Sequence, residues 1–142
     1  MQIGDWTSTS AELIAIKPLA DSLGILVVSP SSTASSLSVP YNMIFRFAPG
    51  DQIVGQAMAN TMINDGKQAL ISISRNDAGS LGLQAGITDH FSSLGGSVYE
   101  EGVFDGTTTD FSTVLNNVKN QILNLSNGYS IDQIRVLTTS FD

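Results

Sequence analysis

The sequence predicts an α/β fold of three layers (α/β/α), with helices on both faces of a mainly parallel sheet. Short aliphatic runs alternate regularly with helical patterns, and the connections between them are short. Strands joined through a crossover helix pair in parallel, with a right-handed crossover. Parallel sheets bury both faces under helices, so the three layers follow from the alternation.

Five segments have the pattern of buried strands, each a short apolar run bounded by turn-forming residues. Gly24 precedes the first run, and Pro49-Gly50 follows the second. The predicted strands are residues 25–28, 43–47, 69–73, 97–104 and 133–137.

Helices are predicted between these strands. The first covers 11–23, with Ser10 as N-cap and Gly24 at its end, and the second runs from Asp51 as N-cap to Gly66. Helical spacing predicts one inward-facing stripe on the second helix, formed by Ile53, Val54, Ala57, Met58, Thr61 and Met62.

Two further helical segments follow, one ending at Gly95-Gly96 and one starting from Asp110 as N-cap. Pro and Gly cluster in residues 48–51, between the second strand and the second helix. A change from one lobe of the protein to another is predicted there.

Composition is that of a globular chain, since 42% of the 142 residues are hydrophobic and 13% are charged. The formal charge of −7 would repel nucleic acid and anionic lipid, so neither is an expected partner. We expect no signal peptide in the first residues and no membrane span, because no apolar run approaches about 20 residues. Either the protein is cytosolic or the sequence starts inside a longer exported chain.

Catalytic and metal-binding machinery is not expected. The sequence has no Cys, its only histidine is His90, and it has no glycine-rich dinucleotide motif, phosphate-binding loop or GxSxG motif. A zinc site would need carboxylates almost alone. We therefore expect a binding protein rather than an enzyme, without metal or cofactor.

Three loops lie where open α/β sheets bind ligands, beyond strand ends and beside helix starts: residues 5–10, 29–36 and 74–80. The first two are rich in hydroxyls and contain no Lys or Arg. Free N–H groups at a helix start and hydroxyls suit a carboxylate, and backbone carbonyls suit an ammonium group. These loops describe a site for an α-amino acid, although the same residues also serve simply as caps and turn formers.

Three stretches resemble type I periplasmic solute-binding proteins of the branched-chain amino-acid (Leu/Ile/Val) receptor family. They occur in the family's order and cover nearly the whole chain. The stretches are TSAELIAIKPLADSLGILVVSPSSTASSLS (9–38), FRFAPGDQIVGQAMA (45–59) and ISRNDAGSLGLQAGITDHFSSLGGSVYEEGVFDGTTTDFSTVL (73–115).

The resemblance implies roles for individual residues. Ser10 matches the serine at a helix start that holds the ligand carboxylate, with Ser8 as a rival for that position. Ser31 and Thr33 match positions whose carbonyl and hydroxyl groups bind the ligand's amino group and carboxylate.

One position departs from the family. A Tyr often stands just before the Gly of the third loop, where the far lobe closes over the ligand, and here that position is Gly79. Asn76, Asp77 and Trp6 are the candidates to replace this contact.

The family has two lobes and more than twice this length, so residues 1–48 would form part of lobe 1 and residues 49–142 most of lobe 2. The resemblance implies a periplasmic or extracellular component of an ABC-type amino-acid transport system, with a membrane permease as partner. A sensory or regulatory domain of the same fold is the alternative. Incomplete sheets leave edges and apolar faces uncovered, so this part of the family's chain is expected to form a homo-oligomer.

Overall fold

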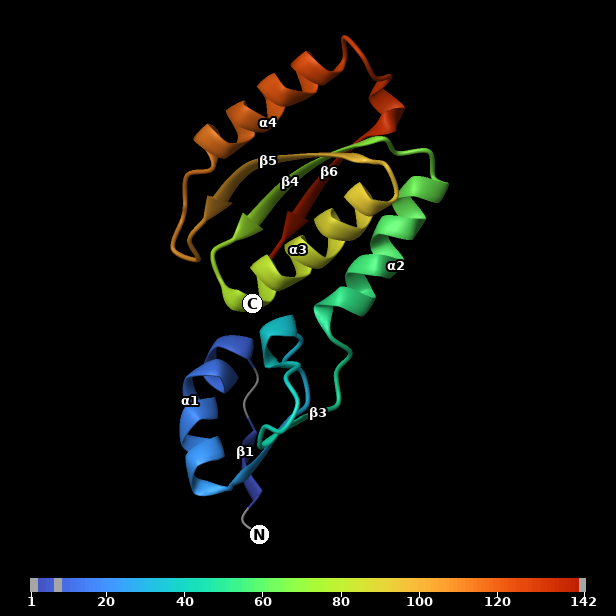
Figure 1. Ribbon diagram of the computed structural model, residues 1–142. Coiled ribbons are helices and arrows are strands. Elements are labelled where there is room, and N and C mark those ends of the chain that lie inside the picture. Colours follow the sequence, from blue (N-terminus) through green and yellow to red (C-terminus); the bar gives the residue numbers. More distant parts are fainter. Residues whose placement is uncertain (1–2, 7–8, 141–142) are drawn as a thin grey trace.

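The computed structural model describes residues 3–6 and 9–140 and contains two units joined by one crossing of the chain (Figure 1). The first unit lies within residues 3–46 and contains β1 (Ile3–Trp6), α1 (Ser10–Leu23), β2 (Leu26–Ser29), the short 3-10 helix η1 (Ser35–Leu37) and β3 (Ile44–Arg46). The second unit follows and contains α2 (Asp51–Asn64), β4 (Ala69–Arg75), α3 (Ala78–Ser93), β5 (Ser97–Phe104), α4 (Ser112–Leu125), the 3-10 helix η2 (Ile131–Gln133) and β6 (Ile134–Thr139).

Each unit has its own three-stranded parallel sheet. The strand order is β1-β2-β3 in the first unit and β5-β4-β6 in the second. The predicted α/β fold with parallel strands is confirmed, and its strands are divided between two sheets.

The strand β1 was not predicted, because its sequence contains Gly and Asp, which are uncommon in strands. Its position comes from pairing with β2, where Ile3 lies opposite Leu26 and Gly4 opposite Val27. Residues 5–6 therefore end a strand, and their assignment to a loop was wrong.

The sheet of the second unit is covered on both faces (Figure 1). On one face α2 and α3 pack over Leu70, with Ile87 and Phe91 fully buried. On the other face α4 contributes Val118 and Leu125 to a separate core around Ile71. The central strand β4 is buried from Ala69 to Ser74, as expected for a strand with neighbours on both edges and both faces.

The stripe predicted for α2 is only partly its buried face. Met62 is buried in the core. Ile53, however, is 64% exposed, and Gly55 and Ala59, outside the predicted stripe, are buried. The helix turns this small-residue face toward α3 because the two backbones approach closely. A Cβ atom added to Gly55 would lie only 2.4 Å from the carbonyl carbon of Gly86.

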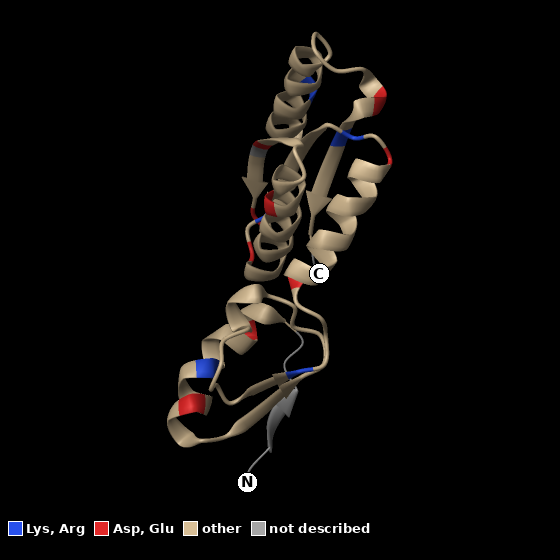
Figure 2. Ribbon diagram, turned by 45° about the vertical axis from the view of Figure 1, so that its right-hand side comes forward, with Lys and Arg blue, Asp and Glu red and all other residues tan. Residues whose placement is uncertain are grey.

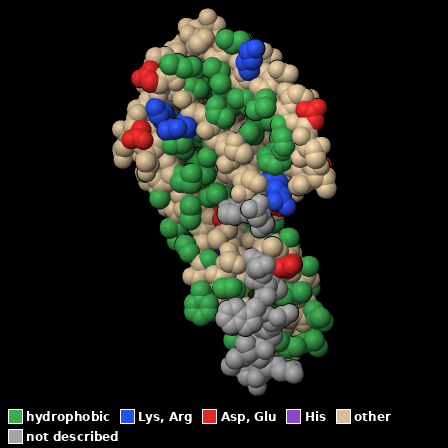
Figure 3. Space-filling view, turned by 180° about the vertical axis from the view of Figure 1, so that it is seen from behind, with side chains coloured by type: hydrophobic (Ala, Val, Ile, Leu, Met, Phe, Trp, Pro, Cys, Tyr) green, Lys and Arg blue, Asp and Glu red, His purple; other side chains and the backbone are tan. Residues whose placement is uncertain are grey.

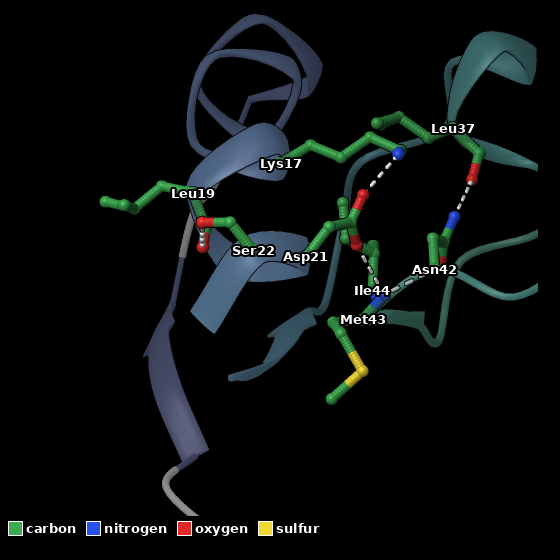
Figure 4. A network of polar contacts seen from close by, with 8 residues as sticks. All are labelled: Lys17, Leu19, Asp21, Ser22, Leu37, Asn42, Met43 and Ile44. Atoms are coloured by element: carbon green, nitrogen blue, oxygen red, sulfur yellow. Dashed lines mark hydrogen bonds and ion pairs between the residues drawn. The ribbon is translucent and has the colours of Figure 1, made fainter. Parts of the chain in front are cut away.

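The sheet of the first unit has α1 on one face only. Leu13 and Ala20 of α1 pack on Val27 of β2 and on Leu37 of η1. The Asp21 carboxylate ties the helix to the segment before β3 by accepting a hydrogen bond from the Met43 N–H at 2.8 Å (Figure 4).

The opposite face of this sheet carries Phe45 and Phe47, which are 51% and 71% exposed. Their rings meet edge to face, with centroids 5.1 Å apart. A view from behind shows hydrophobic side chains at the surface of this end of the molecule (Figure 3). Within the described part of the chain, no helix covers this face.

Candidate functional site

The start of α1 is organised by Thr9 rather than by Ser10. The Thr9 hydroxyl accepts a hydrogen bond from the Glu12 N–H at 3.2 Å, and the Glu12 carboxylate accepts one from the Thr9 N–H at 3.2 Å. This reciprocal capping box makes Thr9 the N-cap, so the prediction of Ser10 in that role was wrong. The pattern Thr-x-x-Glu was present in the sequence as the signal for it.

Ser10, one residue inside α1, uses its hydroxyl for a longer connection. Its buried Oγ accepts a hydrogen bond from the N–H of Ala34 at 3.2 Å. The first two predicted loops therefore meet, and they bring the start of α1 beside the residue that follows Thr33.

The loop after β2 carries its hydroxyls in two environments. Ser29 and Ser32 are buried, and their hydroxyls lie 2.8 Å apart in a hydrogen bond. Ser31 is exposed and Thr33 is half-buried. The structure thus places Ser10 and Thr33 close together, with Ser31 on the outer side of the same loop.

Arg46 holds this loop from β3. Its Nη1 donates to the carbonyl oxygen of Ala34 at 2.8 Å and to that of Ser32 at 3.3 Å, and its Nη2 donates to the Ser38 hydroxyl. A ligand ammonium would share these two carbonyls with the guanidinium, so carbonyls elsewhere in the loop are better placed to accept from it. These hydrogen bonds of Arg46 to the loop were not predicted from the sequence, which left open a pairing with an acid at the lobe junction or a surface role.

The third predicted loop is shorter than expected, because α3 begins at Ala78. Asp77 is the N-cap: its carboxylate accepts from the Ser80 N–H at 2.9 Å and from the Ser80 hydroxyl at 2.7 Å. Gly79 is buried in the first turn of α3. Asn76 donates to the Asp105 carboxylate at 3.0 Å. The Asp77 carboxylate is thus engaged within the chain, and its contact with a ligand stays a prediction.

Two other predicted contacts lie at the N-terminus. Ser8 is outside the described residues. The backbone of Trp6 ends β1, and its side chain is also outside the described part. Both remain predictions.

A cavity of about 380 Å³ opens where η1, α2 and α3 meet. Its lining is polar and apolar in about equal parts, and its polar residues are Ser35, Gln52, Gln56, Asp89, His90 and Ser93. None of Ser10, Ser31 and Thr33 is in this lining, so the cavity is separate from the junction of the two hydroxyl-rich loops.

Charged residues are sparse along the ribbon (Figure 2), and among the described residues ion pairs join Lys17 to Asp21 and Arg75 to Asp77. Among the described residues, no group of three or more His, Cys, Asp or Glu is placed to hold a metal ion. Every helix of the described part is too short or too polar to span a bilayer. What the junction offers a ligand is therefore hydroxyls, backbone dipoles and a helix start.

The sequence pattern of the periplasmic binding proteins matches residues 6–123, most of the chain. The chain belongs to this family. Its members are binding proteins rather than enzymes. Among curated proteins, the chain is 28% identical over 124 residues to an uncharacterized protein of Methanocaldococcus jannaschii, a match that covers 83% of this chain and 30% of the relative.

Two solved structures show the same fold. One is a leucine-binding protein of Thermotoga maritima, with a TM-score of 0.73 and 24% identity, matched over 96% of this chain and 43% of its own. The other is an ABC transporter substrate-binding protein of Desulfitobacterium hafniense in complex with leucine, with a TM-score of 0.64 and 20% identity, matched over 88% and 35%. The chain thus spans less than half the length of these relatives, and the predicted type I fold is confirmed as a partial one.

Proposed function

We propose that this chain is part of the periplasmic or extracellular solute-binding component of an ABC-type transport system, and that it binds an α-amino acid such as leucine or a related small carboxylate. The hydrogen bond from the Ala34 N–H to the Ser10 hydroxyl carries the proposal. This hydrogen bond brings the start of α1 and the hydroxyl-rich loop so close together that one small ligand can contact both.

The chemistry of this junction suits a zwitterion. The first turn of α1 has N–H groups without intrahelical partners, and the capping box satisfies that of Glu12. The N–H groups of Ser10 and Ala11 precede it in the same turn. They lie at the positive end of the helix dipole, where a carboxylate is stabilised. The Ser10 hydroxyl accepts from Ala34, so its own proton is available to a ligand oxygen.

The two units fit the two lobes of such a binder. We assign the first unit to part of lobe 1 (residues 1–48) and the rest to most of lobe 2 (residues 49–142). Closure of the lobes would bring the start of α3, with Gly79, toward a ligand held at Ser10. The closed form would present the surface that a membrane permease recognises.

Calorimetry with three ligands tests the proposal. Leucine is expected to bind, whereas 4-methylpentanoate, which lacks the ammonium group, and 3-methylbutylamine, which lacks the carboxylate, are expected to bind at least about tenfold more weakly. Equal heats for all three, or none for leucine and the other small amino acids, would contradict a zwitterion site.

Matched serine variants locate the site. Ser10→Ala removes the hydroxyl at the start of α1 and is expected to weaken leucine binding about tenfold. Ser22→Ala makes the same change near the other end of the helix, where the hydroxyl bonds only to the Leu19 carbonyl oxygen at 2.9 Å, and is expected to bind as the parent does. Equal losses in both variants would place the site elsewhere.

A further inference from the structure

Asp51 is a carboxylate buried at the crossing between the two units. It is the first residue of α2 and is 1% exposed. Its backbone N–H donates to the carbonyl oxygen of Thr33 at 3.0 Å. Burial has the larger effect on the pKa of the Asp51 carboxylate and raises it, and the Thr33 side chain lies near enough to lower it.

The second oxygen of this carboxylate lies against α3. Oδ2 of Asp51 has no hydrogen-bond partner among the described residues. A Cβ atom added to Gly82 would lie 2.7 Å from Oδ2, and one added to Gly86 would lie 2.9 Å from the Asp51 carbonyl oxygen. The absence of side chains at these two positions of α3 is what leaves room for Asp51, so Asp51 touches both units at once.

Arg46 acts on the same carboxylate through its charge. Burial is the largest influence and raises the pKa of Asp51 above its ordinary value, whereas the Thr33 side chain and the positive charge of Arg46 lower it. Arg46 also donates to the carbonyls of Ser32 and Ala34. The segment of residues 32–34 is therefore bonded to the Arg46 guanidinium and to the backbone N–H of Asp51.

We propose that Asp51 is a positioning residue that sets the conformation of residues 32–34 against Ser10 and so shapes the amino-acid site. The chain of contacts runs from Asp51 to Thr33, on to the neighbouring Ala34, and from the Ala34 N–H to the Ser10 hydroxyl. The link to ligand binding rests on the proposed function, whereas the link to loop conformation does not.

A plainer role for Asp51 is to place a negative charge in the first turn of α2, where the helix dipole favours it. The two roles differ in their dependence on Thr33. Removing the Thr33 hydroxyl keeps the Asp51 carboxylate in the first turn of α2, and it should perturb the loop only if the Asp51–Thr33 contact sets its conformation.

Amide chemical shifts of the whole chain test the proposal without a ligand. Asp51→Asn and Thr33→Val are both expected to move the Ala34 and Ser10 signals, and the double variant is expected to move them no further than either single one. Thr33→Ser, which keeps the hydroxyl, is expected to restore the parent signals. Asp65→Asn, the same change just beyond the other end of α2, is the control and should leave them in place.

Unmoved Ala34 and Ser10 signals in Thr33→Val, or shifts that Thr33→Ser does not reverse, would overturn the proposal. These readouts hold even if Asp51→Asn fails to fold, because the Thr33 variants keep the carboxylate. If the parent binds leucine, Asp51→Asn and Thr33→Val should each weaken it about tenfold. If it does not, the proposed function fails and the shifts still decide the role of Asp51.

Discussion

The two units are built from the same parts, a three-stranded parallel sheet with helices, but they are covered to different extents. The second unit has α2 and α3 on one face of its sheet and α4 on the other, with a separate core on each side. The first unit has a single core under α1, and its other face exposes Phe45 and Phe47. The hydrogen bonds of the candidate site lie mostly in this thinner unit. Most of the buried core therefore belongs to the second unit and most of the candidate site to the first, and Asp51 contacts both units.

The largest expected effect tests the thicker unit. Phe91→Ala empties a fully buried position between α3 and the sheet and should lower the free energy of unfolding by about 3–5 kcal/mol, through lost burial and a residual cavity. Denaturant unfolding followed by circular dichroism measures it.

Phe47→Ala is the matched control for this change. Phe47 is 71% exposed and loses mainly its edge contact with Phe45, so the cost should stay under about 1 kcal/mol. A cost at Phe47 close to that at Phe91 would mean that the exposed face of the first sheet is covered in solution.

Among the described residues, no helix covers one face of the first sheet, and self-association is the next largest expected effect. A parallel sheet with one bare apolar face and open edges is a surface for a second copy of the chain. Light scattering at high concentration is expected to give a mass above that of one chain, and the double variant Phe45→Ser/Phe47→Ser should weaken association at least about tenfold.

Leu115→Ser on α4 provides the comparison for this experiment. Leu115 is 60% exposed, but it lies on the helix of the well-covered unit, so association should be unchanged. Two results would contradict this prediction: a monomeric mass for the parent chain, or an equal weakening of association by both variants. Either would mean that the exposed face with Phe45 and Phe47 does not drive self-association.

Much of this architecture was predictable from the sequence, because the residues that favour a helix end or a buried strand locally are found in those elements in the fold. Gly24 adopts the left-handed conformation at the end of α1, with φ of 63°, as its position in the sequence indicated. The strand β4 is a continuous buried run, as an apolar segment between helices indicates. The division into two lobes near Pro49-Gly50, just before α2 begins at Asp51, stays a prediction.

The remainder depended on contacts between distant segments. The strand β1 exists through its pairing with β2, and the buried face of α2 is chosen by the close approach of Gly55 to Gly86. The hydrogen bond between Ser10 and Ala34 joins residues 24 positions apart. No local pattern specifies such contacts, which is why Asp51 was interpreted as a helix cap and its bond to Thr33 was missed.

The smallest expected effect is a difference in pH dependence between the crossing and the first unit. Burial raises the pKa of Asp51, so its contribution to stability is complete below its unfolded pKa of about 3.9 and is lost as pH rises through the folded value. The hydrogen bond from Lys17, followed by that from the Met43 N–H, lowers the pKa of Asp21. Asp21 therefore stabilises the chain above its unfolded pKa, and this contribution is lost as pH falls through the folded value.

Melting temperatures measured from about pH 3 to pH 7 separate the two carboxylates, since the unfolded pKa of an aspartate lies near 3.9 within that interval. Asp51→Asn should remove the part of the parent's profile that declines with rising pH, because the amide stays neutral. Asp21→Asn should instead remove part of the decline on acidification. The opposite signs make each variant the control of the other. Profiles that change in the same direction would mean that Asp51 is not desolvated at the crossing, and that the two units are less tightly joined there than the contacts of Thr33 and Gly82 indicate.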